Sequence, residues 1–117
     1  RDFTNVTDVV DAIYTVFKSN KKIVDIFNVG SGKTVSVITL AKKISDKFIH
    51  IPKRPGEPDC TFADIKKIKK QFGWKPKIKI DKGINIVLKN IDYWKNASLW
   101  TKNSIAKATV DWFKYLK

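Results

Sequence analysis

The sequence predicts an α/β fold in which short apolar strands alternate with amphipathic helices. Five stretches carry apolar residues at the spacing of a helix face. Between them, residues 23–29 and 48–51 form short apolar runs that are typical of strands. The first run is apolar almost throughout, so we expect it to be buried on both faces of a sheet.

The first half of the chain contains two predicted helices, and each is followed by one of these strands. We expect Thr7 or Asp8 to cap the first helix, which runs to about Ser19. A glycine-rich turn ends the first strand, and Ser36 is expected to cap the second helix, over about 37–47. The second strand then leads into a proline-rich loop.

The loop at 52–58 contains three prolines in seven residues, which preset many of its φ angles. Each residue before a proline is driven toward extended geometry, so Arg54 and Glu57 are expected on stiff, extended backbone. Such a loop suits a polar ligand, because little freedom is lost on binding. Taken alone, however, the loop is better interpreted as a rigid connector with solvated charges.

The segment after the loop predicts a well-delimited helix. We expect Asp64 to cap it and Gly73 to end it. Its apolar face includes Ile68 and Phe72, and its lysines face water. Trp74 is then expected to pack back on the end of this helix.

Two more helices are predicted in the C-terminal part of the chain. Asp81 is expected to cap one that runs to about Trp94, and Ser104 to cap the last. The last helix carries Trp112 and Phe113. We expect these aromatic side chains to pack in a core. A contact between subunits is the alternative, because aromatic residues are enriched at interfaces.

Three motifs, in this order within residues 1 to about 90, resemble the C-terminal lobe of the nucleotide-sugar epimerases and dehydratases. The first is Arg-Asp-aromatic-x-x-Val-x-Asp-Val-Val at 1–10, and the second is Phe-Asn-Val-Gly-Ser-Gly at 27–32. The third is Arg-Pro-Gly-Glu at 54–57, continued by Thr-x-Ala-Asp and by a lysine-rich helix that ends in Gly-Trp-x-Pro. These enzymes form the extended short-chain dehydrogenase/reductase family, typified by UDP-galactose 4-epimerase.

This resemblance implies the C-terminal part of a Rossmann-type enzyme, cut from a longer parent protein. Residues 1–32 would be the C-terminal edge of the Rossmann-like domain, with the last helix and strand of its sheet. Residues 33–117 would form a small helical, substrate-binding lobe. The parent would be an NAD-dependent isomerase or lyase, and NAD would be bound by its N-terminal part.

The resemblance also implies four substrate-binding residues. Arg1 and Arg54 would hold the diphosphate of a nucleotide sugar, Phe3 would lie beside the nucleotide, and Glu57 would accept hydrogen bonds from the ribose. Both arginines of the chain fall on these positions, and every other cation is a lysine. We expect Arg54 to bind more strongly than Arg1, because Arg1 lies at the end of this chain, where backbone frays.

Several shorter patterns carry no function in this interpretation. Residues 32–34, Gly-Lys-Thr, lack the earlier glycine that a phosphate-binding P-loop requires, since Phe27 stands there. Tyr14 and Lys18 match the spacing of the family's catalytic pair, but that pair lies upstream of the region that this chain resembles, so we predict no catalytic residue. The Gly-x-Gly-x-x-Gly fingerprint for NAD is absent from the sequence. His50 is the only histidine and has no cluster of metal ligands around it in the sequence, so no metal site is predicted.

The chain has a formal net charge of +13, and such a surface attracts polyanions, including nucleic acid. The lysines are spread over every segment, however, and the aromatic residues do not alternate with them as in a base-stacking surface. We therefore expect a nucleotide-diphosphate sugar as the partner and not a nucleic acid. A basic nucleic-acid-binding module or a protein-interaction module is the alternative.

Compartment and assembly are inferred from single features. The one cysteine, Cys60, excludes an internal disulfide and fits the reducing cytoplasm, and we expect its thiol to be packed. No apolar run approaches the roughly 18 residues of a membrane span, so no membrane partner is predicted. Because residues 23–29 predict a strand with two apolar faces, we expect self-association, for example as a homodimer.

Overall fold

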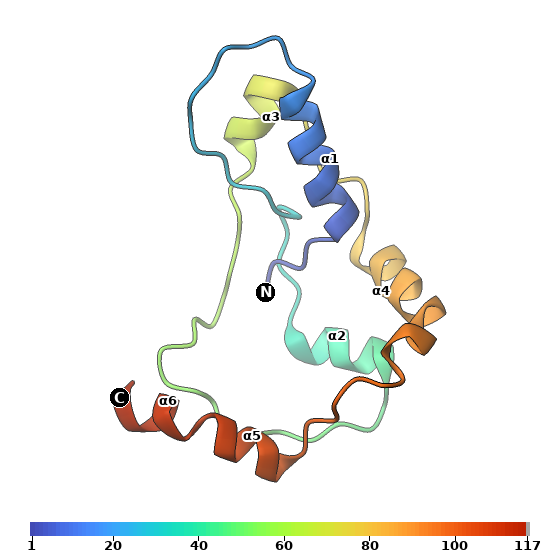
Figure 1. The fold of residues 1–117 in the computed structure, drawn as a ribbon, viewed down its shortest axis with the longest axis vertical. Helices are drawn as coiled ribbons and strands as arrows, with labels where there is room; N and C mark the ends of the chain where they lie inside the picture. The colour runs from blue at the N-terminus through green and yellow to red at the C-terminus, as the bar shows by residue number, and fades with distance from the viewer. Residues whose placement is uncertain (117) are drawn as a thin grey trace.

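The computed structural model describes residues 1–116, which form short helices joined by long segments without regular structure (Figure 1). In chain order the helices are α1 (Val6–Phe17), α2 (Val37–Ile44), α3 (Lys66–Phe72), α4 (Ile80–Lys89), the 3₁₀ helix η1 (Ile91–Trp94), α5 (Lys102–Ala108) and α6 (Val110–Tyr115). Helices α1 and α3 lie together at one end of the molecule, and α5 and α6 form the opposite end (Figure 1).

The two strands predicted at 23–29 and 48–51 are absent, and no strand occurs anywhere in residues 1–116. A strand persists only where a neighbouring strand takes up its backbone hydrogen bonds. Neither run has such a neighbour among the described residues, and the side chains of Val24 and Ile26 are exposed. The described part of the chain is therefore helical, and the predicted α/β class is not confirmed there.

The N-terminal end of α1 differs from the prediction. Asn5, and neither Thr7 nor Asp8, caps the helix, because the Asn5 side chain accepts a hydrogen bond from the Thr7 backbone N–H at 3.0 Å. Asp8 is only 2% exposed and has a different role. Its two carboxylate oxygens accept from the backbone N–H groups of Lys77 and Ile78 at 2.9 and 3.0 Å. Asp8 thus joins α1 to the segment before α4.

The other helix ends confirm only some of the predicted signals. Asp81 does not cap α4 but lies in its first turn, because the helix begins at Ile80 and ends at Lys89, before the predicted end at about Trp94. Ser36 caps α2 as predicted, because its hydroxyl accepts from the Thr39 backbone N–H at 3.0 Å. Asp64 accepts from the Lys66 backbone N–H at 2.9 Å, but Ile65, and not Asp64, is the residue next to α3. Gly73 ends α3 with a φ of 70°, a conformation that glycine adopts without strain. The last cap was predicted one turn late: Thr101 caps α5, and Ser104 completes a reciprocal capping box with it.

The hydrophobic core is small and lies between α1 and α3. Its buried members are Ala12, Ile68 and Trp74, and Phe27 and Phe72 pack partly buried against them. Trp74 therefore packs beside α3, as predicted. A second contact joins α2 to α4, and the ion pair between Lys43 and Asp81 bridges these helices at 2.6 Å.

The described part of the chain is less compact, and exposes more surface, than is usual for a domain of this size. The radius of gyration is 17.7 Å, whereas about 13 Å is usual for a compact domain of this length. The described residues expose 9909 Å², against about 6,500 Å² for a compact monomer of the same mass. The expected core packing of the C-terminal aromatic residues is wrong, since Trp112 and Phe113 are both substantially exposed. The thiol of Cys60 is exposed as well, and not packed.

Candidate functional site

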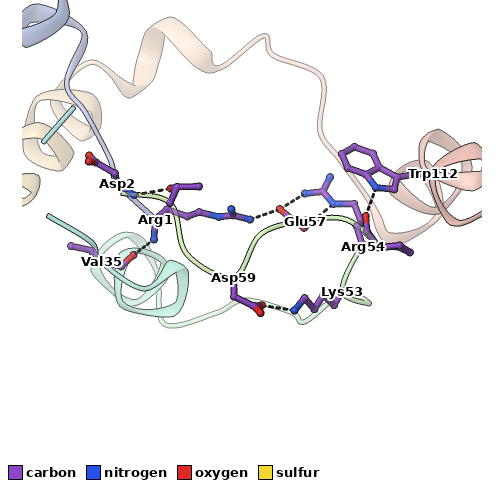
Figure 2. Close-up of polar contacts among 10 residues, drawn as sticks. Arg1, Asp2, Val35, Lys53, Arg54, Glu57, Asp59 and Trp112 are labelled. Atoms are coloured by element: carbon purple, nitrogen blue, oxygen red, sulfur yellow. Dashed lines mark hydrogen bonds and ion pairs between the residues drawn. The ribbon is translucent and has the colours of Figure 1, made fainter. Parts of the chain in front are cut away.

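The carboxylate of Glu57 bridges the two arginines of the chain (Figure 2). Arg1 Nη2 donates to Glu57 Oε1 at 2.8 Å. Arg54 forms a two-pronged contact, with Nη2 donating to Oε1 at 3.1 Å and Nε donating to Oε2 at 3.2 Å. Arg1 and Glu57 are 56 residues apart in the sequence, so the tertiary structure assembles this cluster.

A tight turn at Arg54-Pro55-Gly56-Glu57 places Arg54 and Glu57 next to each other. The Glu57 N–H donates to the Arg54 carbonyl at 3.4 Å, and Gly56 has a φ of 72°. Proline followed by a glycine with positive φ is the pattern of a type II turn. The prediction of extended backbone at both residues is therefore incomplete, because the proline and glycine fold the loop back and bring the two side chains together.

Arg1 is held at both its backbone and its side chain. Its N-terminal ammonium group donates to the Val35 carbonyl at 2.7 Å, and the Val35 N–H donates to the Arg1 carbonyl at 2.9 Å. The side chain is 22% exposed and paired with Glu57. The structure therefore does not show the expected fraying at Arg1. The reason for expecting Arg54 to bind phosphate more strongly than Arg1 no longer holds.

Asp2 connects the three motifs that the sequence analysis identified. Its carboxylate accepts from the backbone N–H groups of Ser31 and Ala63 at 2.8 and 3.1 Å, and its own N–H donates to the Thr61 hydroxyl at 3.0 Å. A Cβ atom on Gly30 would lie 2.4 Å from the Ala63 Cβ, so only glycine allows this close approach. Burial raises the pKa of Asp2, but hydrogen bonds from Ser31 and Ala63 outweigh it and lower that pKa below the usual value.

We expect Asp2→Asn to remove part of the acid sensitivity of folding. A carboxyl group whose pKa is lower in the folded state stabilises the fold above its unfolded pKa of about 3.9, and this contribution disappears as pH falls through the folded pKa. Thermal unfolding of the 117-residue chain between neutral pH and about pH 3 should show the wild type more stable at neutral pH, with the difference shrinking on acidification. Asp46→Asn, at an exposed position, is the control. A constant difference across this range would contradict the role of Asp2.

The cluster formed by Arg1, Arg54 and Glu57 has a net positive charge and has N–H donors that remain available for an anion. Hydrogen bonds from Arg54, together with the charges of both arginines, hold the pKa of Glu57 below its usual range. Two guanidinium groups and one carboxylate carry a net positive charge. A guanidinium has five N–H donors, of which Arg1 uses one on Glu57 and Arg54 uses two. The remaining donors suit phosphate oxygens, which guanidinium groups bind in pairs.

Phe3 lies in a different part of the surface. It lines a hollow of about 480 Å³ together with Val35, Ile78 and Lys79, and neither this hollow nor the other one that Phe3 borders includes Arg1, Arg54 or Glu57. The structure thus brings three of the four predicted substrate-binding residues together and places Phe3 on a neighbouring surface.

Two residues at the site were not foreseen. Asp2 stands in the same motif as Arg1, but its hydrogen-bond partners Ser31 and Ala63 lie 29 and 61 residues away in the sequence, so no local signal predicts them. Trp112 had no such signal: its ring lies against Arg54, whose guanidinium carbon is 5.0 Å from the ring centroid. Only the folded chain shows this contact.

Two negative findings apply to the described residues. Residues 1–116 contain no group of three or more histidine, cysteine, aspartate or glutamate side chains that could hold a metal ion. None of the helices in this range is long and apolar enough to cross a membrane.

A family model for GDP-mannose 4,6 dehydratase matches residues 1–87, which is most of the chain. The chain therefore belongs to this family of nucleotide-sugar epimerases and dehydratases, as its motifs indicated. The matched region contains Arg1, Arg54 and Glu57, and it ends before α5 begins.

Curated relatives agree with this assignment. The chain is 34% identical over 91 residues to UDP-glucose 4-epimerase 2 of Oryza sativa, covering 69% of this chain and 22% of that protein. It is 36% identical over 84 residues to UDP-arabinose 4-epimerase 1 of Arabidopsis thaliana, covering 66% and 20%. It is also 36% identical over 105 residues to an uncharacterised protein, MJ1055, of Methanocaldococcus jannaschii, covering 80% and 31%. The chain thus spans only about a fifth to a third of the length of these relatives, and no solved structure matches it.

Proposed function

We propose that this chain is the substrate-binding C-terminal part of a nucleotide-sugar epimerase or dehydratase, and that it binds the diphosphate of a nucleotide sugar. The observation that carries the proposal is the cluster in which Glu57 joins Arg1 and Arg54. The names of the curated relatives, UDP-glucose and UDP-arabinose 4-epimerases, support a nucleotide-diphosphate sugar as ligand.

Each residue of the cluster has a defined task in this proposal. Arg1 and Arg54 each donate to phosphate oxygens with the N–H groups that Glu57 leaves free. Glu57 pairs with both guanidinium groups and so fixes the distance between them. Its carboxylate also accepts hydrogen bonds from the ribose hydroxyl groups. Phe3 would lie beside the nucleotide only if the ligand extends toward the hollow that this side chain lines.

The parent enzyme is proposed to be NAD-dependent and cytoplasmic. No residue of this chain is assigned to NAD, because the sequence lacks the glycine fingerprint that binds the pyrophosphate of that cofactor. Residues 1–32 would complete the Rossmann-like domain of the parent and residues 33–117 would form its substrate lobe. In that setting, residues 23–29 would gain the neighbouring strand that they lack here. No catalytic residue is proposed within the chain.

The exposed apolar surface supports a proposal of self-association. Side chains such as Val24, Ile26 and Leu99 are almost fully exposed, and apolar surface on this scale favours burial against a partner. We therefore propose that the 117-residue chain forms dimers or larger assemblies in solution. Sedimentation that shows a single compact monomer at all concentrations would contradict this proposal.

The function is tested by comparing UDP, UDP-glucose and uridine with one another and with duplex DNA. Titration calorimetry of the 117-residue chain should show saturable binding of UDP and of UDP-glucose, and weaker binding of uridine, which lacks the diphosphate. Duplex DNA tests the alternative of a basic nucleic-acid-binding module, which the net charge of +13 would favour. Tighter binding of DNA with a steep salt dependence, and no preference for UDP over uridine, would favour that alternative.

A further inference from the structure

The C-terminal helices fold back onto the loop that carries Arg54 (Figure 2). Trp112, in α6, donates its indole N–H to the carbonyl oxygen of Pro55 at 2.6 Å. The Arg54 guanidinium carbon lies 5.0 Å from the centre of the same ring. Trp112 therefore contacts both the backbone and the side chain of the turn that forms the cluster.

This contact comes from outside the region that the family model matches. That region ends at residue 87, and Trp112 lies beyond it in α6. Thr109 stands at the junction of α5 and α6, where its hydroxyl donates to the Ile105 carbonyl at 2.8 Å. The junction and the helices on either side of it line a hollow of about 590 Å³ that also includes Arg54.

We propose that Trp112 is a positioning residue for Arg54, and this inference rests on the proposed diphosphate site. A free arginine side chain has many rotamers, and fixing it opposes binding. Stacking on an indole ring uses the face of the guanidinium and leaves its N–H edge available. In this structure that edge is directed to Glu57. The indole N–H on Pro55 holds the turn itself.

The two contacts of Trp112 can be separated by substitution. Trp112→Phe keeps an aromatic face for Arg54 but removes the hydrogen bond to Pro55, whereas Trp112→Leu removes both. Trp100→Leu is the matched control, because Trp100 is also near the C-terminus and is 68% exposed, against 39% for Trp112. Circular dichroism checks that each variant keeps its helices.

Affinity for UDP, measured by calorimetry, is the first readout. We expect Trp112→Leu to weaken binding roughly three- to tenfold, Trp112→Phe to weaken it less, and Trp100→Leu to leave it unchanged. In an Arg54→Ala background, Trp112→Leu should have no further effect, because a positioning residue acts only through the group that it positions. Losses that multiply in the double variant would overturn the proposal.

The second readout does not depend on the ligand. In an NMR spectrum the Arg54 side-chain N–H resonance should be displaced by the ring current of Trp112, and Trp112→Leu, but not Trp100→Leu, should abolish the displacement. An Arg54 resonance that does not respond to Trp112→Leu would overturn the inference. If the wild type binds no UDP while the Arg54 resonance responds as expected, the proposed function fails but the contact with Trp112 stands.

Discussion

Asp8→Ala is expected to destabilise the chain by about 3 kcal/mol or more. The carboxylate is 2% exposed and accepts from the backbone N–H groups of Lys77 and Ile78. Alanine would remove both hydrogen bonds, and a hydrogen bond to a charged group contributes about 1.5–3 kcal/mol. Because the buried core is small, this loss is a large part of a typical total of about 5–15 kcal/mol. Urea unfolding followed by circular dichroism measures it.

Asp11→Ala is the matched control for this prediction. Asp11 lies on the same helix and contacts the same partner, but its carboxylate pairs with the Lys77 side-chain ammonium at 2.9 Å on the surface. Surface ion pairs contribute about 0–1 kcal/mol, so the control should change stability little. Equal effects of Asp8→Ala and Asp11→Ala would show that the buried backbone contacts are not what stabilises this region.

Arg54→Ala is expected to weaken binding of UDP about tenfold or more, since a charge-assisted hydrogen bond contributes about 1.5–3 kcal/mol. Arg54 donates to Glu57 through two nitrogens, and its guanidinium carbon lies over the Trp112 ring, 5.0 Å from the ring centre. Arg54→Lys keeps the charge but loses the forked geometry, so its affinity should lie between those of alanine and the wild type. Calorimetry at low and at physiological salt measures all three proteins.

Lys53→Ala separates this specific contact from general attraction. Lys53 is the neighbouring cation, its side chain is 67% exposed, and it pairs with Asp59 on the surface. We expect its removal to change affinity for UDP less than about twofold, because exposed charges are screened by salt. If Lys53→Ala and Arg54→Ala weaken binding equally, the chain attracts UDP by its net charge and the cluster has no special role.

Local signals in the sequence predicted those features that neighbouring residues decide. The cap at Ser36 and the end of α3 at Gly73 follow from contacts within a few residues, and the helical spacing of apolar residues predicted that Ile68 is on the buried face of α3. The motifs around Arg1 and Arg54 likewise identified the family, because they are read directly from residue order.

Features that depend on distant partners could not be predicted in this way. A run such as 23–29 has the composition of a strand, but a strand needs a second strand, and none pairs with it in residues 1–116. Aspartate is a residue type that often caps helices, yet the hydrogen-bond partners of Asp8, Lys77 and Ile78, lie about 70 residues away in the sequence. In both cases the partner, and not the local sequence, decides the structure.

The candidate site shows the same division. The sequence by itself determined which residues carry the charge: Arg1, Arg54 and Glu57, on motifs that resemble a nucleotide-sugar-binding lobe. Only the tertiary structure decided that Glu57 bridges the two guanidinium groups and that Arg54 lies over the ring of Trp112. The physical reason is that ion pairing and ring stacking act over a few ångströms, so they depend on how the chain brings together residues 1, 54–57 and 112.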